Sequence, residues 1–221
     1  MTALHGQIIK TVREISRDKL VLGTWGNVSA REGKGFWITP SGMPYDQMTE
    51  SDLVYINPAD GKFTGRWKPS SEWRLHAEIY RRRPDCGAIV HTHSIYATAF
   101  AVARTAVLPV TEDIAQVTGG RVEVADYALS GTQELAVNAA KALGDRNAVL
   151  LAGHGLVGTA ADLQEALKVC QIVEKTAQVM LLARLLGEIH VLEEEDVRRL
   201  RHFYLTGYGP GRGEDNNENI N

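Results

Sequence analysis

Three histidines have the spacing that metal coordination requires. His91 and His93 form an H-x-H pair at the end of Ala88–Thr92, an apolar, β-branched run that predicts a buried strand. Side chains alternate between the two faces of a strand, so positions i and i+2 point the same way and can bind one ion. His154 follows a second apolar run at 148–152 and lies between two glycines, which allow close backbone approach. Three histidines at two strand ends match the catalytic zinc pattern that leaves one position open. The H-x-H pair alone is equally compatible with two hydrogen-bonded structural histidines.

Glu72 is a fourth candidate for the same site. It lies in the first turn of a predicted helix, directly behind Ser70 and Ser71, either of which can cap that helix. A carboxylate beside a divalent cation can ligate the metal or act as a base. At a helix N-terminus it can also do no more than complement the helix dipole. Both interpretations are open at this point.

The four other histidines are weaker candidates. His76 lies one turn beyond Glu72 on the same helix face, where it either supports the site or is an ordinary core or surface residue. His5, His190 and His202 stand in charged stretches that are predicted to be helical. We expect these three side chains to be solvated.

Three short polar turns suggest a place for an anion. They span residues 23–27, 39–42 and 69–71, and they combine small side chains with backbone N–H groups and hydroxyl or amide donors. Such turns can bind phosphate without much positive charge, although each taken alone is an ordinary turn. No G-x-G-x-x-G follows a predicted strand and no P-loop lysine motif is present, so nucleotide binding is not supported.

The elements that would position these residues alternate between helix and strand. Helices are predicted over residues 2–20, 69–83, 94–104, 111–117, 133–143 and 162–186. Strands are predicted over residues 28–31, 35–39, 53–57, 88–92, 107–110 and 148–152. This interleaving predicts a single layered α/β domain over residues 1–206, followed by a flexible tail over 207–221 that is rich in Gly, Asn and acidic residues.

Composition excludes several classes of protein. The chain has 221 residues, 44% of them apolar and 23% charged, which is close to an average globular domain. A chain of this length buries roughly 70% of its unfolded surface on folding, so it needs no disulfides or structural metal to stabilise its core. The net charge of −3 argues against a nucleic-acid binder. Apolar stretches such as 179–183 are far shorter than the ~20 residues of a membrane span.

The compartment is predicted from what the sequence lacks. Charged residues recur through residues 1–19, so there is no secretory h-region. Cys86 and Cys170 are the two cysteines, and one pair in a chain of this size indicates reduced packing thiols rather than a disulfide. We therefore expect a cytoplasmic protein.

Five ordered motifs resemble those of the class II aldolase/adducin superfamily, and within it those of the L-fuculose-1-phosphate aldolase type. They are TWGNVS at 24–29, ITPSGMPY at 38–45, PSSEW at 69–73, HTH at 91–93 and GHGL at 153–156. The resemblance covers the chain from about residue 5 to residue 200. It implies an α/β/α fold with a central, mostly antiparallel sheet, assembled as a homotetramer with active sites between subunits.

The resemblance also implies an activity. Such a protein would be a metal-dependent carbon–carbon lyase that cleaves a ketose 1-phosphate, such as L-fuculose 1-phosphate or a 5-deoxypentulose 1-phosphate, to dihydroxyacetone phosphate and an aldehyde. The implied ligands of Zn²⁺, or of Mn²⁺ or Co²⁺, are Glu72, His91, His93 and His154, with Glu72 also serving as the catalytic acid/base. The implied phosphate-binding residues are Gly26, Asn27, Ser41, Gly42, Ser70 and Ser71.

Two departures from the family pattern affect the aldehyde side of the expected site. Asp113 stands where the fuculose-phosphate enzymes have a tyrosine, and Ser130 stands where they have an aromatic residue. Three C-terminal aromatics, Phe203, Tyr204 and Tyr208, are candidates to close over the site.

Other activities of the superfamily remain alternatives to cleavage. They are pentulose-phosphate 4-epimerisation, methylthioribulose-1-phosphate dehydration and sugar-acid phosphate decarboxylation. Asp113 keeps the epimerase open, because a carboxylate there can exchange a proton. A non-catalytic, adducin-like assembly module is a further alternative, and it would be expected to lack metal ligands.

Overall fold

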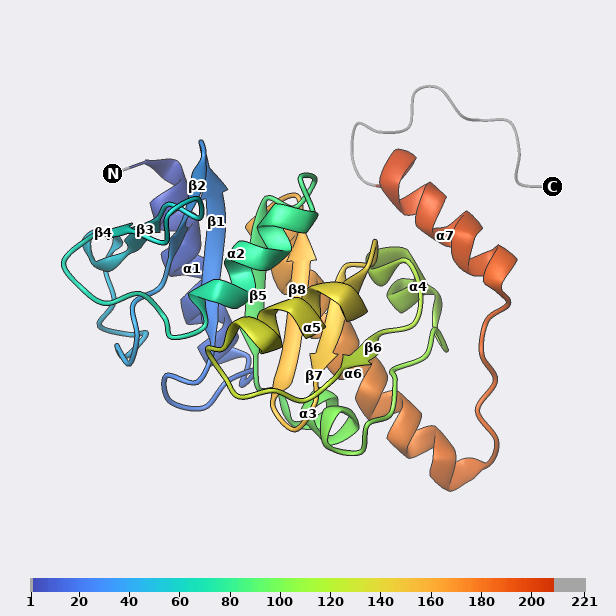
Figure 1. Cartoon of the computed structure of the whole chain (residues 1–221). Coiled ribbons are helices and arrows are strands. Elements are labelled where there is room, and N and C mark those ends of the chain that lie inside the picture. Colours follow the sequence, from blue (N-terminus) through green and yellow to red (C-terminus); the bar gives the residue numbers. More distant parts are fainter. Residues whose placement is uncertain (1, 209–221) are drawn as a thin grey trace.

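The computed structural model describes residues 2–208, which form one eight-stranded sheet with helices on both faces (Figure 1). Most of the predicted tail, residues 209–221, lies outside the described residues. The strands are β1 (Asn27–Glu32), β2 (Gly35–Ile38), β3 (Val54–Ile56), β4 (Phe63–Thr64), β5 (Ala88–Thr92), β6 (Glu123–Ala125), β7 (Ala148–Leu151) and β8 (Gly155–Ala160). The helices are α1 (Ala3–Arg17), α2 (Trp73–Arg82), α3 (Ile95–Val102), α4 (Glu112–Thr118), α5 (Gln133–Leu143), α6 (Leu163–Leu186) and α7 (Glu194–Thr206), with a short 3-10 helix at Glu50–Asp52.

The sheet is antiparallel except at one edge. Its strand order is β4-β3-β2-β1-β5-β8-β7-β6, and only the β6–β7 pair among the described strands is parallel. In the centre, β1 and β8 flank β5, with Asn27 and Val157 both opposite His91. The predicted α/β layers around a mostly antiparallel sheet are confirmed.

Helices cover both faces of the sheet, so each face has its own core. Figure 1 shows α2 and α5 in front of the sheet and α1 and α6 behind it, with α3 and α4 packed against α6. Neighbouring residues of β7 alternate between the two cores: Leu150 lies in the core beneath α1 and α6, whereas Leu151 lies in the core beneath α2 and α5. Because both faces are covered, every residue of β5, β7 and β8 is buried.

The main differences from the predicted elements are in segments whose local sequence pattern does not indicate the element that forms. β8 follows directly on the glycines around His154 and contains Gly155 and Gly158, so its sequence looks like a turn. The segment predicted as a strand at 107–110 makes only an isolated bridge, between Val107 and Val122. Short strands β4 and β6 were also not predicted, and α7 was expected only as a charged helical stretch around His202, without bounds.

Buried residues correct one expectation and confirm another. His5 was expected to be solvated, but only 7% of it is exposed, because its ring packs edge-to-face on Trp37 with centroids 4.4 Å apart. His190 and His202 are exposed, although His190 lies between α6 and α7 rather than in a helix. Cys86 and Cys170 are free and buried, as predicted for packing thiols, and burial raises the pKa of each to about 12.

None of the helices in residues 2–208 combines the length and the apolar character needed to cross a membrane.

Because helices cover both faces of the sheet, residues in each of the two cores should contribute to the stability of the fold. We expect Leu150→Ala and Leu151→Ala each to lower the free energy of unfolding by about 2–5 kcal/mol, because each removes a fully buried side chain from a different core. Leu22→Ala, at a residue that is 75% exposed, should stay within about 0.5 kcal/mol of the parent. Urea unfolding measures all three, and a large cost at only one of the two core positions would contradict the two-core arrangement.

Candidate metal centre

The four candidate metal ligands come from three separate parts of the fold and meet at one end of the sheet. β5 and β7 end there and β1 and β8 begin there, at the lower edge of the sheet in Figure 1. His91 lies within β5 and His93 directly follows that strand, whereas His154 lies in the turn between β7 and β8. Glu72 is the residue immediately before α2, at its N-cap, rather than in the first turn as predicted.

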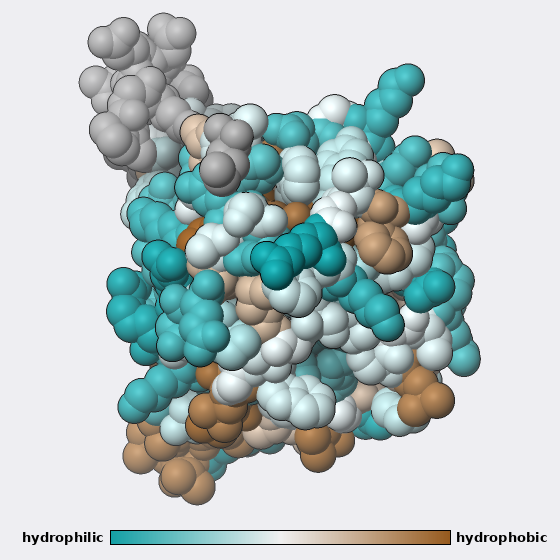
Figure 2. Space-filling model, turned by 90° about the vertical axis from the view of Figure 1, so that its left-hand side faces the viewer, coloured by the Kyte–Doolittle hydropathy of each residue, from teal (hydrophilic) through white to brown (hydrophobic). Residues whose placement is uncertain are grey.

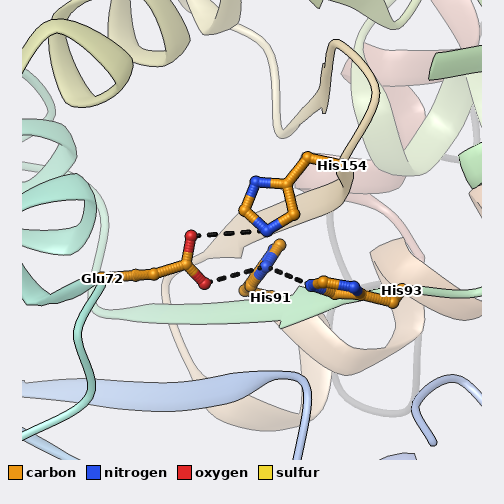
Figure 3. Close-up of side chains that lie close together, drawn as sticks. All are labelled: Glu72, His91, His93 and His154. Carbon is orange, nitrogen blue, oxygen red and sulfur yellow. Dashed lines mark hydrogen bonds and ion pairs between the residues drawn. The ribbon is translucent and has the colours of Figure 1, made fainter. Parts of the chain in front are cut away.

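The side chains point at a common centre (Figure 3). His91 Nε2 lies 3.0 Å from His93 Nε2 and 3.1 Å from Glu72 Oε2. His154 Nε2 lies 3.5 Å from Glu72 Oε1, and one ligand atom from each of the four residues lies within 4.8 Å of all the others. The three imidazole rings are mutually arranged edge-to-face, each pair with centroids 4.8 Å apart.

Two glycines allow His154 to reach this centre. Gly153 has a φ of +64°, a left-handed conformation that side chains other than glycine rarely adopt. At Gly155, a Cβ atom would lie 2.3 Å from the carbonyl oxygen of Thr92 on the neighbouring strand. The turn that carries His154 can therefore pass against the end of β5 only because both neighbours lack a side chain.

The sheet itself orients His91. The Nδ1 atom of His91 lies 2.9 Å from the carbonyl oxygen of Leu156 on β8, and since that oxygen can only accept, Nδ1 carries the proton. Its Nε2 lone pair is then directed at the common centre. A second hydrogen bond of this kind is the usual way in which proteins fix a metal-binding imidazole.

The carboxylate of Glu72 is buried and held on both oxygens. The Asn27 amide donates to Oε2 and the Ser130 hydroxyl donates to Oε1, each at 3.0 Å. Burial alone would raise the pKa of Glu72, but the charge and hydrogen bond of His91, together with the Asn27 amide, hold it far below its usual range. Glu72 is therefore an anion at neutral pH in this environment.

The protein keeps two of the three imidazoles neutral. Burial and the neighbouring imidazoles lower the pKa of His93 to about 3 and that of His154 to about 4. Burial opposes charge on His91 as well, but the adjacent Glu72 carboxylate outweighs it and raises the pKa of His91.

The donor set fits a divalent transition metal. Three imidazole nitrogens and one carboxylate oxygen are the ligands that zinc and its neighbours in the first transition row prefer. A metal at their centre would also replace the close approach of the His91 and His93 nitrogens with two bonds to a cation. The group can therefore hold a metal ion.

A chain of buried hydrogen bonds continues from Glu72 into the core. Asn27 uses its amide nitrogen on Glu72 and its oxygen, Oδ1, on His76 Nε2, at 2.5 Å. The other ring nitrogen of His76 lies 2.6 Å from the Ser29 hydroxyl, which in turn contacts the Tyr80 hydroxyl. His76 is fully buried, and burial lowers its pKa to about 3, so it stays neutral. It fixes which way the amide of Asn27 faces.

A cavity of about 450 Å³ opens above the metal centre. Glu72, His93 and His154 line it, and His91 is buried behind them. All six residues predicted to bind phosphate also line this cavity, namely Gly26, Asn27, Ser41, Gly42, Ser70 and Ser71. The three polar turns, which are separate in the sequence, thus meet in the lining of a single pocket.

The remaining candidates lie elsewhere in the chain. Asp113 does not line the cavity: its carboxylate pairs with Lys175 and accepts from the Thr111 hydroxyl. Tyr204 accepts from Lys168 and donates to Glu165 on α6. Phe203 and Tyr208 pack with each other beside it, so none of the three C-terminal aromatics closes this cavity within the described chain.

Three cavity-lining residues were not found from the sequence. Trp25, Tyr127 and Leu129 are the large, mainly apolar residues among those that line the pocket. Trp25 stands inside a turn that was considered only for phosphate binding. Tyr127 and Leu129 lie in an irregular segment with no periodic pattern, so no signal in the sequence marked them.

The chain belongs to the class II aldolase and adducin family. Residues 6–181 match the family described as "Class II Aldolase and Adducin N-terminal domain". The chain is 40% identical to the L-fuculose phosphate aldolase of Escherichia coli K12 over 207 residues, which cover 93% of this chain and 95% of that protein. It is 35% identical to the 5-methylthioribulose-1-phosphate/5-deoxyribulose-1-phosphate aldolase of Rhodospirillum rubrum, covering 94% and 93% of the two chains.

Solved structures agree with the sequence relatives. A structure of L-fuculose 1-phosphate aldolase superimposes with a TM-score of 0.89 at 38% identity, covering 93% of this chain and 97% of that one. The similarity therefore extends over most of the chain, and the family match over residues 6–181 includes every segment that contributes to the candidate metal centre.

The burial of His76 generates a pH prediction. The pKa of His76 is about 3 in the folded protein and about 6.5 when unfolded, so between these values the unfolded state binds a proton that the folded state does not. Stability therefore falls as the pH falls through this window, by about 1.4 kcal/mol per pH unit for this one group.

Urea unfolding in a chelator between pH 6 and pH 4 measures this slope. His76→Gln should flatten it by about that amount, because glutamine does not titrate. The exposed His202→Gln serves as the matched control and should keep the slope of the parent. Equal slopes in His76→Gln and the parent would mean that His76 is not held neutral in the folded state.

Proposed function

We propose that this chain is a metal-dependent aldolase that cleaves a ketose 1-phosphate to dihydroxyacetone phosphate and an aldehyde. The observation that carries this proposal is the meeting of three imidazoles and one carboxylate at the floor of a cavity whose wall is built from three polar turns. The family membership and the aldolases named among the relatives support the same reaction class.

The polar turns supply the site for the phosphate. Ser70 and Ser71 lie immediately before Glu72, so a phosphate held there is within one sugar phosphate's length of the metal ligands. The hydroxyl of Ser70 accepts from the backbone N–H of Glu72 at 3.3 Å, which leaves its own proton available to donate to a phosphate oxygen. Recognition by hydroxyl, amide and backbone donors fits a pocket whose lining contains no lysine or arginine.

Zn²⁺ held by Glu72, His91, His93 and His154 would supply Lewis-acid polarisation of the substrate carbonyl. Cleavage breaks the bond between C3 and C4 of the ketose. As this bond breaks, the proton of the C4 hydroxyl passes to the Glu72 carboxylate, C4 becomes the aldehyde carbon, and the electron pair stays on the three-carbon fragment. Glu72 then delivers that proton to C3 of this fragment and becomes an anion again, and the same transfers run backwards in the reverse direction. Asn27 and Ser130 orient the carboxylate for this transfer, since each donates to one of its oxygens.

The alternatives are less well supported. A 4-epimerase would gain from an acid/base at Asp113, but this carboxylate lies outside the cavity of its own protomer and is already paired with Lys175. The dehydratase and decarboxylase alternatives would use the same metal centre, and the aldolases named among the relatives favour cleavage over both. A non-catalytic assembly module would be expected to lack metal ligands, whereas all four converge here.

Three further parts of the proposal concern the oligomeric state, the domain bounds and the cellular compartment. We propose a homotetramer with active sites between subunits, a single domain over residues 1–206 and a cytoplasmic location. Large apolar side chains on the C-terminal half of α6, including Leu182, Leu185 and Leu186, are exposed in the single chain and support contact with another subunit. The two free, buried cysteines are in keeping with a reducing compartment.

The direct test measures dihydroxyacetone phosphate, by a coupled enzyme assay, from a panel of ketose 1-phosphates with the zinc-loaded protein. Triose phosphate release is expected and should disappear after chelation and return with added Zn²⁺. An epimerised sugar phosphate without triose phosphate would overturn the aldolase proposal and favour the epimerase. The absence of both metal uptake and turnover would favour the non-catalytic module.

Glu72→Gln tests the proposed acid/base. Three imidazoles remain in this variant, so the metal should still bind, while loss of the titrating group should lower kcat by about 10²–10⁴-fold. Glu78→Gln changes a carboxylate on the same helix that pairs with Arg81 and Arg82, and it should leave kcat nearly unchanged. Zinc content and kcat are measured together. Turnover close to the parent in Glu72→Gln would show that another group moves the proton.

His154→Ala tests the metal ligands independently of catalysis. Removing a direct ligand should weaken Zn²⁺ binding by more than the roughly 10–100-fold typical of residues that only support a ligand. Titration against a chromophoric chelator gives the affinity, with the exposed His190→Ala as control. Zinc affinity equal to that of the parent would exclude His154 from the coordination sphere.

A further inference from the structure

We infer that Lys68 and Arg74 form a cationic rim beside the 69–71 turn, and that the charge of this rim attracts the substrate phosphate to the cavity and strengthens its binding there. This inference rests on the proposed function, because that function supplies the phosphate group. It adds to the proposed function the source of the positive charge that acts on this group and the two residues that provide it.

The cavity lining lacks the charge that its proposed ligand calls for. A phosphate group on an organic molecule carries a charge of about −1.5 to −2 at neutral pH. The lining contains the Glu72 carboxylate but no lysine or arginine. Hydroxyl, amide and backbone N–H donors can bind a phosphate oxygen, yet they carry no net charge. Apart from a bound metal, a cation that acts on the phosphate must therefore stand just outside the lining.

The backbone places Lys68 where two of the polar turns meet. The Lys68 carbonyl oxygen accepts from the Ser41 N–H, and the Ser70 N–H donates to the Thr39 carbonyl oxygen, each at 3.0 Å. An isolated antiparallel bridge joins the same two segments. Side chains alternate along such an extended segment, so those of Lys68 and Ser70 leave it on the same side. Ser70 lines the cavity and Lys68 does not, which puts Lys68 at the rim.

Arg74 follows the same turn in the sequence, as the second residue of α2. It is exposed, and its guanidinium carbon lies 4.6 Å from the centroid of the Trp73 ring. The N-terminus of a helix is the positive end of its dipole, where acidic residues are favourable and cations are not. The first turn of α2 nevertheless has an arginine and no acidic residue. A bound anion beside the turn would make this cation favourable.

No acidic side chain neutralises the two cations in the part of the chain that the structure describes. Residues 61–71 contain three cations and no acid. No carboxylate oxygen of residues 2–208 lies within 4.0 Å of the charged nitrogens of Lys68 or Arg74, and Glu72, the nearest acid in the sequence, turns its carboxylate to the candidate metal-ligand histidines. This uncompensated positive charge stands beside the phosphate turns of a chain whose net charge is −3.

The segment that leads to Lys68 lies on an open face of the single chain. Figure 2 shows the molecule from the side on which β3 and β4 lie in Figure 1, and hydrophilic residues are spread across this face. Lys68 and Arg74 are both exposed. Exposed charges act over the Debye length, about 10 Å at 0.1 M salt, and raise the local concentration of an oppositely charged ligand. The two cations and the positive end of α2 therefore act on the same incoming phosphate.

Calorimetric titration of the zinc-loaded protein with inorganic phosphate tests the rim without requiring turnover. In the parent, we expect the affinity to fall as NaCl is raised from about 0.01 M to about 1 M, because the Debye length shortens from about 30 Å to about 3 Å. Lys68→Gln and, separately, Arg74→Gln should each weaken phosphate binding about three- to tenfold at the lower salt concentration, a part of the roughly 10–10³-fold that a charged cleft provides. At the higher concentration, both variants should agree with the parent within about twofold.

Two control variants separate charge from structure. Lys68→Arg keeps the charge and should keep the phosphate affinity and the salt dependence of the parent. Lys34→Gln removes another exposed lysine, in the β1–β2 turn at the end of β1 remote from Asn27, and it should also behave like the parent. Lys68 and Arg74 are exposed, and Lys68 bonds Ser41 through its backbone, so their substitutions are expected to fold.

Turnover gives a second measurement. In the coupled assay for triose phosphate at low salt, Lys68→Gln should raise KM by about three- to tenfold and change kcat by less than about twofold, because the rim acts on binding and touches no reacting atom. A loss confined to kcat would contradict a role in attracting the phosphate.

The outcomes separate this inference from the proposed function. Phosphate affinities of Lys68→Gln and Arg74→Gln equal to that of Lys34→Gln at low salt, or no measurable phosphate binding to the parent there, would overturn the cationic rim, and release of triose phosphate would still support the aldolase proposal. Salt-dependent phosphate binding that weakens in both variants, without triose phosphate from any ketose 1-phosphate, would overturn the aldolase proposal and support the rim as an anion site.

Discussion

The structure depends on one constraint: three imidazoles and a carboxylate must face a single point at the end of a sheet. The neighbouring strands, the β7–β8 turn and helix α2 each position one or more of these four side chains. The pairing of β5 with β8 places Leu156 where its carbonyl oxygen can fix the His91 ring. The missing side chain at Gly155 lets the β7–β8 turn lie against the end of β5, which carries His154 to the other two rings. Helix α2 begins at the same edge, so the residue before it, Glu72, completes the group.

Burying a carboxylate in this place is costly unless both oxygens have partners. Asn27 and Ser130 provide these partners. Asn27 is itself oriented by His76: the neutral imidazole donates from Nε2 to the Asn27 amide oxygen and accepts at Nδ1 from the Ser29 hydroxyl. The buried network therefore links the core to the Glu72 carboxylate and fixes its orientation. His76 lies four residues along the sequence from the nearest candidate ligand and could have been incidental, but its contacts make it part of how Glu72 is held.

Much of the site could be predicted because its signals are local. The H-x-H spacing on β5 and the glycines around His154 are visible in any reading of the sequence, and the bounds of β5 and α5 were predicted without error. What could not be predicted depends on contacts between distant segments. The sequence of β8 resembles a turn because its glycines are needed for close packing rather than for bending. His5 is buried against Trp37, which lies 32 positions later in the chain. Tyr127 and Leu129 reach the pocket from a loop whose position is set by β6 and α5.

The residues that line the cavity differ in how strictly geometry restricts them. The three polar turns combine small residues with hydrogen-bond donors at fixed positions, and they therefore appear as motifs. Tyr127 and Leu129 stand in an irregular segment, where many residue types can line a cavity. Ser130 belongs to the same segment and is restricted by one contact, since its hydroxyl donates to Glu72. The candidate metal ligands and the polar turns can therefore be recognised in the sequence, whereas the apolar lining residues cannot.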